Sequence, residues 1–191
     1  MNASDTNFEV ELPDCTAMER TITPVQKLFA FCFHGLIEGV VAVLAQGGRV
    51  TWRSPEGFTP LLAAAQEGHT DICALLLAHG SNVNETTPLQ NLTALHYAVA
   101  KGHNTLVEAL LSWGAETSPQ NHLGQTPLYV SSQEGHLRCV LSLLKAGASL
   151  TLPDNQGMLP IHVAARWNKV EIIGTFLEHG CSPNMVSLTK S

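Results

Sequence analysis

The sequence predicts an all-α solenoid built from consecutive helix–turn–helix units. Three landmarks recur together along the chain, each with spacings of 34, 33 and 33 residues. Such periodicity is typical of stacked helical units, because one unit cannot bury its apolar face alone. The landmarks are a threonine site at Thr59, Thr93, Thr126 and Leu159, a first glycine site at Gly68, Gly102, Gly135 and Asn168, and a second glycine at Gly80, Gly114, Gly147 and Gly180.

Each unit contains the signals of two helices. Thr59 and Thr126 are suited to cap a helix whose first residue is proline, where a missing N–H costs nothing. Small residues such as Ala98 at the centre of this helix allow neighbouring helices to approach closely. The first glycine is expected to end it in a left-handed conformation. A second helix follows, with apolar residues three and four positions apart, and ends at the second glycine.

These units resemble ankyrin repeats, in which T-P-L-H, A-A, G-H and G-A motifs recur about every 33 residues. The segment from Gly57, GFTPLLAAAQEGHTDICALLLAHG, shows most of the pattern. The resemblance implies antiparallel helix pairs joined by β-hairpin-like loops that project to one side. It divides the chain into an acidic N-terminal segment 1–22, a degenerate repeat 23–53, four repeats at 57–86, 91–120, 124–153 and 157–186, and a tail 187–191.

The first repeat departs from the pattern at its start. Thr23-Pro24 lies three residues before the position that the period assigns to the threonine, so the first helix is expected to gain a turn. Divergence is expected in a terminal repeat because one face lacks a neighbour. The segment before it, residues 1–22, carries five acidic residues against Arg20 and is expected to be flexible.

Composition and charge exclude several classes of protein. Hydrophobic residues make up 45% of the chain, which argues against global disorder. The net charge of −6 argues against nucleic-acid or anionic-membrane binding, and no stretch predicts a membrane span. The five cysteines are odd in number and lack CxxC or CxxH spacing, so neither a disulfide framework nor a zinc site is supported. A reducing compartment, cytoplasmic or nuclear, fits best.

The residues that bear chemistry have positional explanations. His69, His103 and His136 recur at one site of the repeat, and the resemblance implies that they bond backbone groups of the loops. Equivalent sites lie about 8–10 Å apart in packed helix layers, too far to share a metal. Ser131-Ser132 replaces the usual alanine pair and lacks a GxSxG context. We therefore expect no enzyme activity, no cofactor and no metal site.

The candidate site is instead a protein-binding surface. Ankyrin-like arrays bind partners through the residue before the threonine, the two before the first glycine, and the hairpin tip. The large apolar groups at these positions, Phe58, Leu92, Met158 and Trp167, are expected to be exposed. Trp113 is expected to pack against the following loop. The candidate residues are Trp52, Arg53, Phe58, Gln66, Glu67, Leu92, Lys101, Gln125, Gln133, Glu134, Met158, Arg166 and Trp167.

The resemblance implies a non-enzymatic interaction module that binds a protein or peptide on its concave face, as an adaptor, scaffold or substrate receptor. The alternative is an inhibitor that masks a kinase or a transcription factor. The last repeat carries the apolar residues Val170, Ile172, Ile173, Phe176 and Leu177, and some of these must face the position of a sixth repeat. We expect a further segment or a partner to cover this face.

Two local features remain. Asn84 in LLLAHGSNVN resembles the hairpin site that an oxygen-dependent asparaginyl hydroxylase modifies in many ankyrin repeats; the equivalent Thr51, Ser118 and Thr151 lack the amide, and Asn184 follows a proline. A structural role for Asn84 in its turn is compatible with this reading.

Asn84 to Thr93 spans nine residues, against eight at the other junctions. This extra residue indicates either a specific contact or tolerated drift.

Overall fold

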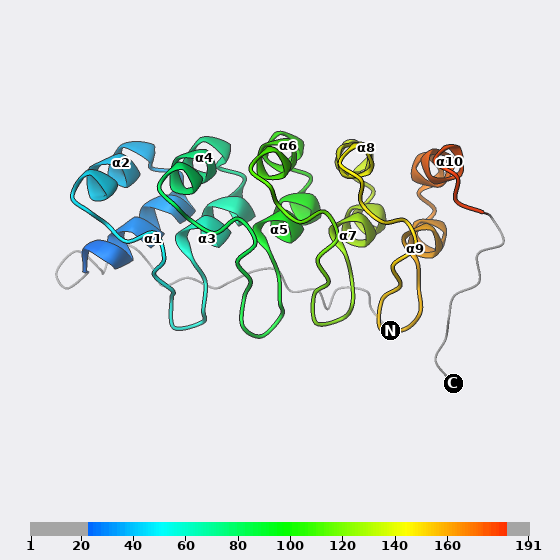
Figure 1. Cartoon of the computed structure of the whole chain (residues 1–191), viewed down its shortest axis with the longest axis horizontal. Coiled ribbons are helices and arrows are strands. Elements are labelled where there is room, and N and C mark those ends of the chain that lie inside the picture. The colour runs from blue at the N-terminus through cyan, green and yellow to red at the C-terminus, as the bar shows by residue number, and fades with distance from the viewer. Residues whose placement is uncertain (1–22, 183–191) are drawn as a thin grey trace.

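The computed structural model describes residues 23–182. The segment 1–22, the last four residues of the repeat at 157–186 and the tail 187–191 lie outside these described residues. The described part forms five antiparallel helix pairs in a single row, with hairpin loops projecting to one side (Figure 1). The helices are α1 Pro24–His34, α2 Ile37–Ala45, α3 Pro60–Glu67, α4 Thr70–Ala78, α5 Ala94–Lys101, α6 Asn104–Ser112, α7 Pro127–Glu134, α8 Leu137–Lys145, α9 Pro160–Arg166 and α10 Val170–Glu178.

The odd-numbered helices, called inner here, start and stop where the sequence predicts. The hydroxyl oxygens of Thr59 and Thr126 accept hydrogen bonds from N–H groups three residues on, and the following proline is the first helical residue. α1 is longer than the other inner helices because its cap is Thr23, which forms a capping box with Gln26. The expected extra turn of the first helix is therefore present.

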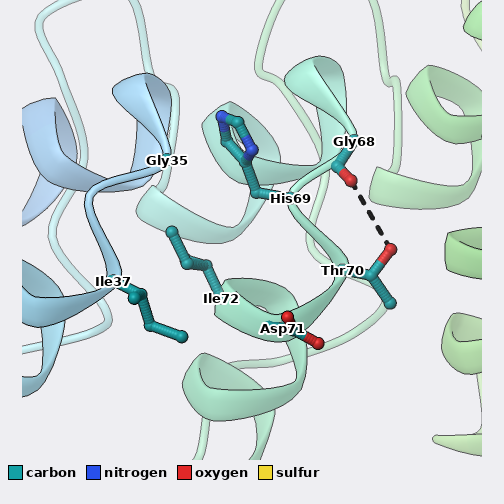
Figure 2. A pocket seen from close by; sticks show the side chains of 7 residues that line it. All are labelled: Gly35, Ile37, Gly68, His69, Thr70, Asp71 and Ile72. Atoms are coloured by element: carbon teal, nitrogen blue, oxygen red, sulfur yellow. Dashed lines mark hydrogen bonds between the residues drawn. The ribbon is translucent and has the colours of Figure 1, made fainter.

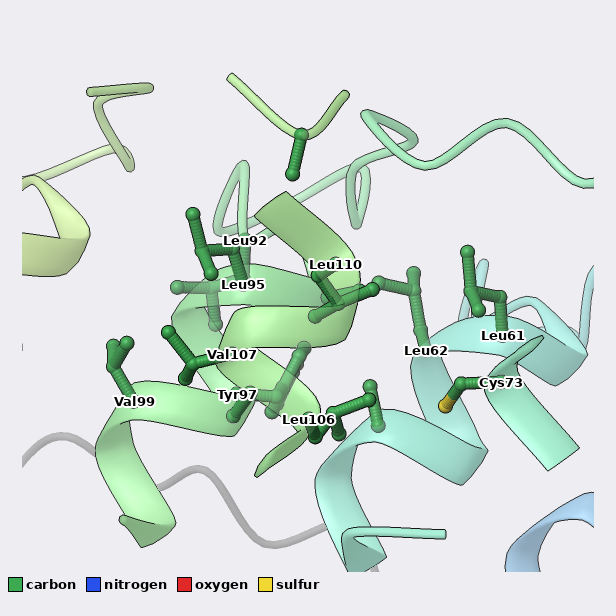
Figure 3. Close-up of a cluster of buried hydrophobic side chains, with 14 of the residues drawn as sticks. Leu61, Leu62, Cys73, Leu92, Leu95, Tyr97, Val99, Leu106, Val107 and Leu110 are labelled. Atoms are coloured by element: carbon green, nitrogen blue, oxygen red, sulfur yellow. The ribbon is translucent and has the colours of Figure 1, made fainter. Parts of the chain in front are cut away.

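Two layers of helices enclose the core. Inner helices contact one another in sequence along the row. The even-numbered helices, called outer here, form a parallel layer on top of them (Figure 1). Buried leucines from both layers fill this core, including Leu62 of α3 and Leu106 and Leu110 of α6 (Figure 3). Ala98 at the centre of α5 is fully buried, as the close approach of α3 and α7 requires. The Ser131 and Ser132 hydroxyls are also buried, and both donate to the Leu128 carbonyl within α7.

A ladder of side chains joins the turn of each repeat to the one before. His69 Nε2 lies 3.1 Å from the carbonyl oxygen of Phe33, and His136 Nε2 lies 3.3 Å from that of Ala100. In the last repeat a lysine replaces the histidine, and Lys169 Nζ donates to the Glu134 carbonyl at 3.0 Å. The glycine before the turn is required for this contact, because a Cβ at Gly68 would lie 2.7 Å from the His103 ring and φ there is +79°.

Each hairpin tip is closed by the same pair of hydrogen bonds. Asp154 N–H donates to the Met158 carbonyl, and the Asp154 carboxylate accepts from Met158 N–H. Ser54 and Phe58 form the same pair, as do Asn121 and Gln125. These local bonds leave little regular sheet, and the described residues contain a single isolated bridge, between Thr86 and Thr93.

The extra residue of the second junction, between the second and third repeats, is absorbed in its tip. Thr87 and Leu92 form the closing pair there, so the tip is one residue longer than the other three. Asn91 adopts a φ of +53° where the other tips have glycine. The helix pairs on either side keep their packing, because the insertion lies beyond the closing bonds.

Candidate partner-binding surface

The inner helices present a row of exposed side chains at their carboxyl ends. Glu67, Lys101, Glu134 and Arg166 each form the last residue of an inner helix, and Trp167 follows directly. The row is presented by one repeating scaffold, because successive inner helices pack against one another along the array. Its side chains nevertheless differ from repeat to repeat in size and charge. We call Glu67, Lys101, Glu134, Arg166 and Trp167 the inner-helix row.

The expectation that Phe58 and Leu92 are exposed is wrong. Both side chains are buried, and the Phe58 ring lies 5.8 Å from the ring of Tyr97 in the next repeat. The residue before the threonine therefore packs beneath the following repeat rather than facing a partner. Met158 stays half-buried at the equivalent position, where no described repeat follows.

Two of the candidate glutamines are also buried. Gln125 is held by the Asn121 side chain, and its carbonyl oxygen lies 3.1 Å from His96 Nε2. Gln66 is buried along α3, and its amide donates to the Glu67 carboxylate at 3.1 Å. Gln133 repeats this contact with Glu134 while remaining half-buried. The glutamines therefore orient or support their neighbours, and the acidic residues beside them carry the exposed charge.

Arg53 is engaged within the chain. Its guanidinium donates to the Gly57 and Thr86 carbonyl oxygens and pairs with the Glu85 carboxylate at 2.5 Å. Gln120 makes the same two backbone contacts, to Gly124 and Pro153, two repeats later. A residue at this position thus ties one hairpin to the next.

Trp52, beside Arg53, is half-buried. Its ring packs edge-on against Phe29 of the first repeat at 5.6 Å. This edge-to-face contact covers part of the Trp52 ring, and the rest of the side chain is left open to solvent.

A polar cluster lies between the last two repeats. The buried Tyr129 hydroxyl is within hydrogen-bonding reach of Asp154 and Gln125, and the charge of Arg166 acts on it. Burial raises the pKa of Tyr129, Asp154 raises it further, and Arg166 opposes the shift. Tyr129 therefore stays a neutral phenol, and the Arg166 guanidinium lies close to repeat four.

Two exposed apolar side chains are not among the candidate residues predicted from the sequence. Leu89, in the lengthened tip, is 86% exposed. The break in the period at this junction is the signal that could have identified it. Trp113 at the end of α6 is 46% exposed, so about half of its surface is open to solvent.

Asn84 connects two hairpins. Its side-chain oxygen accepts a hydrogen bond of 2.9 Å from the N–H of Glu116 in the next repeat. The local turn is made by Asn82, whose side chain accepts from Asn84 N–H. Ser118 repeats the contact between hairpins by accepting from Ser149 N–H. The structural role of Asn84 is therefore between repeats rather than within its own turn.

No arrangement of catalytic type is found among residues 23–182. An open hollow of about 370 Å³ lies between the turns of the first two repeats, where His69 and Asp71 are the titratable groups (Figure 2). His69 is committed to Phe33, and Thr70 donates to the Gly68 carbonyl across the hollow. The described part of the chain contains no group of three or more His, Cys, Asp or Glu residues that could hold a metal ion. Within residues 23–182, no helix is long and apolar enough to cross a membrane.

The cysteines of the helices are buried and weakly acidic. Desolvation raises the pKa of Cys32 to about 12 and that of Cys139 to about 11. It also raises the pKa of Cys73, where nearby Cys32 adds to the shift. These thiols stay protonated and pack as small apolar side chains.

The last repeat exposes positions that are covered elsewhere in the row. Val170 is 67% exposed on α10, and Leu177 is exposed although the equivalent Leu77 is buried. Ala165 is likewise exposed, whereas its counterpart Ala65 is fully buried. These side chains form an apolar face toward the position of a further repeat, which we call the end face (Ala165, Val170, Ile173 and Leu177).

Comparison with known proteins agrees with this architecture. The chain is 38% identical over 99 residues to "Ankyrin repeat and KH domain-containing protein mask" of Drosophila melanogaster, covering 51% of this chain and 2% of that protein. It is 38% identical over 100 residues to "Putative E3 ubiquitin-protein ligase XBAT35" of Arabidopsis thaliana, covering 51% of this chain and 22% of that protein. It is 34% identical over 104 residues to "Protein HOS4" of Saccharomyces cerevisiae, covering 54% and 9%.

These matches span about half of this chain and a small part of each relative. The family model described as "Ankyrin repeats (3 copies)" matches residues 28–121 and 114–187, which is most of the chain. Together with the five stacked helix pairs, this match establishes that the chain belongs to the ankyrin-repeat family.

Proposed function

We propose that this protein binds a protein or peptide across its inner helices and hairpin tips, as an adaptor, scaffold or substrate receptor without enzyme activity. The observation that carries the proposal is the inner-helix row, where one fixed backbone position bears acidic, basic and aromatic side chains in turn. Ankyrin repeats serve as protein-interaction modules, and solenoids offer extended surfaces of this kind. Arg166 and Trp167 are residue types that are enriched at interface hot spots.

The contact surface extends from the row to the tips in this proposal. Leu89 projects from the lengthened tip, and Met158 lies half-buried beside the Tyr129 cluster. The receptor role agrees with the names of two relatives, "Putative E3 ubiquitin-protein ligase XBAT35" of Arabidopsis thaliana and "Probable E3 ubiquitin-protein ligase XBOS34" of Oryza sativa. Masking of a kinase or a transcription factor is the alternative role for the same surface.

The test is affinity capture from cell lysate with the parent chain and two tryptophan variants. Trp167→Ala removes an exposed ring from the row, and Trp113→Ala removes a ring of similar exposure at the end of an outer helix. We expect proteins that the parent captures to be lost with Trp167→Ala and retained with Trp113→Ala. Equal capture by all three chains would contradict the proposed surface.

We also propose that Asn84 is a substrate of an asparaginyl hydroxylase. Its side-chain oxygen holds Glu116 N–H, so access requires local opening of two neighbouring hairpins. Incubation with such an enzyme, followed by peptide mass analysis, is expected to add the mass of one oxygen atom to the Asn84 peptide. Asn84→Ala is the control. No mass gain, even after mild destabilisation of the array, would exclude the modification.

We propose further that the end face is covered by another segment or by the partner. Its apolar side chains occupy positions that are shielded in the other repeats.

A cytoplasmic or nuclear location suits the buried free thiols, since disulfides are rare in those compartments. Fractionation of cells that express the chain tests the location.

A further inference from the structure

The charges of the inner-helix row alternate in sign along the array. Glu67, Lys101, Glu134 and Arg166 follow one another on successive inner helices, reading negative, positive, negative, positive. Arg166 lies one position earlier in its repeat than the other three, and Trp167 takes the position that they occupy. All four charged side chains are exposed.

These charges are not used within the chain as ion pairs. In the described part of the protein, the ion pair found joins Arg53 to Glu85, so none of the four has an opposite charge within 4.0 Å. Neighbouring helix axes lie about 8–10 Å apart, too far for direct pairing along the row. Lys169 approaches Glu134 through its main-chain carbonyl rather than its carboxylate. The four charges therefore remain available to a second molecule.

Two of the charges oppose the local preference of the helix. Glu67 and Glu134 end α3 and α7, where the helix dipole favours a cation, as Lys101 and Arg166 provide on α5 and α9. In both acidic repeats a glutamine precedes the glutamate and donates to its carboxylate. Alanine precedes Lys101 instead. A side chain whose charge opposes the helix dipole, and which a neighbouring side chain orients, is expected at a functional position.

From this geometry we propose that the partner is an extended segment with charged residues at every third position, ordered positive, negative, positive, negative along the direction from Glu67 to Arg166. A polyproline II segment, an extended form with three residues per turn, advances about 3.1 Å per residue, so every third side chain lies on the same side and about 9 Å further on, which matches one repeat. The inference rests on the proposed function and specifies the chemistry of the partner. Charge order, rather than net charge, selects the segment.

The probes are fluorescently labelled Gly/Ser peptides with Lys or Glu at every third position, in all sign orders. Binding is measured by anisotropy at an ionic strength of about 20 mM, where screening is weak. We expect the two strictly alternating orders, which cover both chain directions, to bind at least about fivefold more tightly than block orders of the same composition. This advantage should disappear at high salt.

The decisive variant inverts the first three charges of the row as Glu67→Lys, Lys101→Glu and Glu134→Lys. For this comparison each alternating peptide carries a Phe at one end, placed to lie beside Trp167 and so fix the register. We expect the variant to prefer the alternating order that the parent binds less tightly. The matched control is Asp71→Lys, Arg138→Glu and Glu171→Lys, which makes the same change in net charge on the outer helices. The control should keep the parent preference, and thermal melting checks that both variants are folded.

Three outcomes would overturn the inference. These are a parent chain that ranks peptides by net charge alone, an inverted row that keeps the parent preference, and the absence of peptide binding at low ionic strength. Each of these leaves the capture experiment with Trp167→Ala unaffected. Loss of the partner-binding role would show instead as unchanged capture by that variant, so the two failures are distinguishable.

Discussion

His96 joins two repeats through both nitrogens of its buried ring. Thr93 N–H donates to Nδ1 at 3.2 Å, so Nε2 carries the proton and donates to the Gln125 carbonyl of the next repeat at 3.1 Å. Protonation of Nδ1 would break the first bond and place a charge in the core. Desolvation accordingly lowers the pKa of His96 to about 4, although the bond to Gln125 opposes the shift.

This shift predicts that the array loses stability in mild acid. His96 in the unfolded chain binds a proton below about pH 6.5, whereas the folded chain binds it only near pH 4. The stabilisation is therefore fully present above pH 6.5 and falls by up to about 3 kcal/mol as the pH drops to 4. Urea unfolding across this range measures it. His96→Gln should flatten the slope, whereas His179→Gln at an exposed site should preserve it.

At the scale of the helix, the small centre of α5 sets the distance between repeats. Ala98 is fully buried between α3 and α7. We expect Ala98→Leu to destabilise the array by about 1–3 kcal/mol, because the added methyl and methylene groups force the neighbouring helices apart. Ala78→Leu on the exposed end of α4 is the control and should change little. A parent-like melting temperature for Ala98→Leu would contradict the packing described for this helix.

Replacement of the acidic residue at the end of α3 or α7 is expected to raise the stability of the array rather than lower it. Glu67→Lys places a cation at a helix carboxyl end and should raise stability by about 0.3–1 kcal/mol. Glu38→Lys replaces an acidic residue in the first turn of α2 and should lower it by a similar amount. Denaturant titration of the two single variants gives both signs. A loss of stability for Glu67→Lys would mean that Glu67 serves the fold rather than a partner.

The sequence predicted correctly the features that depend on residues within a single repeat. The caps at Thr59 and Thr126 and the glycine ends follow from residues within a few positions of one another. It failed where the outcome depends on the next repeat. Phe58 is buried because Tyr97 lies above it, and Asn84 bonds Glu116 because the hairpins stack. Spacing along the chain does not report which side chains a neighbouring repeat covers.

Across the whole molecule, burial differs between the middle of the row and its end. Leu77 and Leu177 occupy the same position in the second and fifth repeats, but only Leu77 is buried. We expect Leu77→Ala to cost about 2–5 kcal/mol, whereas Leu177→Ala should cost well under 1 kcal/mol because its side chain already faces solvent. Chemical unfolding of both variants measures the difference. Equal costs would show that the end face is covered in the isolated chain.

The lengthened tip also shows how the protein can be extended. The closing bonds of Thr87 and Leu92 separate the residues around Leu89 from the helix layers, so one added residue leaves the stacking unchanged. Exposed tips of this kind are where domain insertions and grafted epitopes are best tolerated. A foreign recognition loop placed between Pro88 and Gln90 would be held by the scaffold at one edge of the array, within reach of whatever occupies the inner helices.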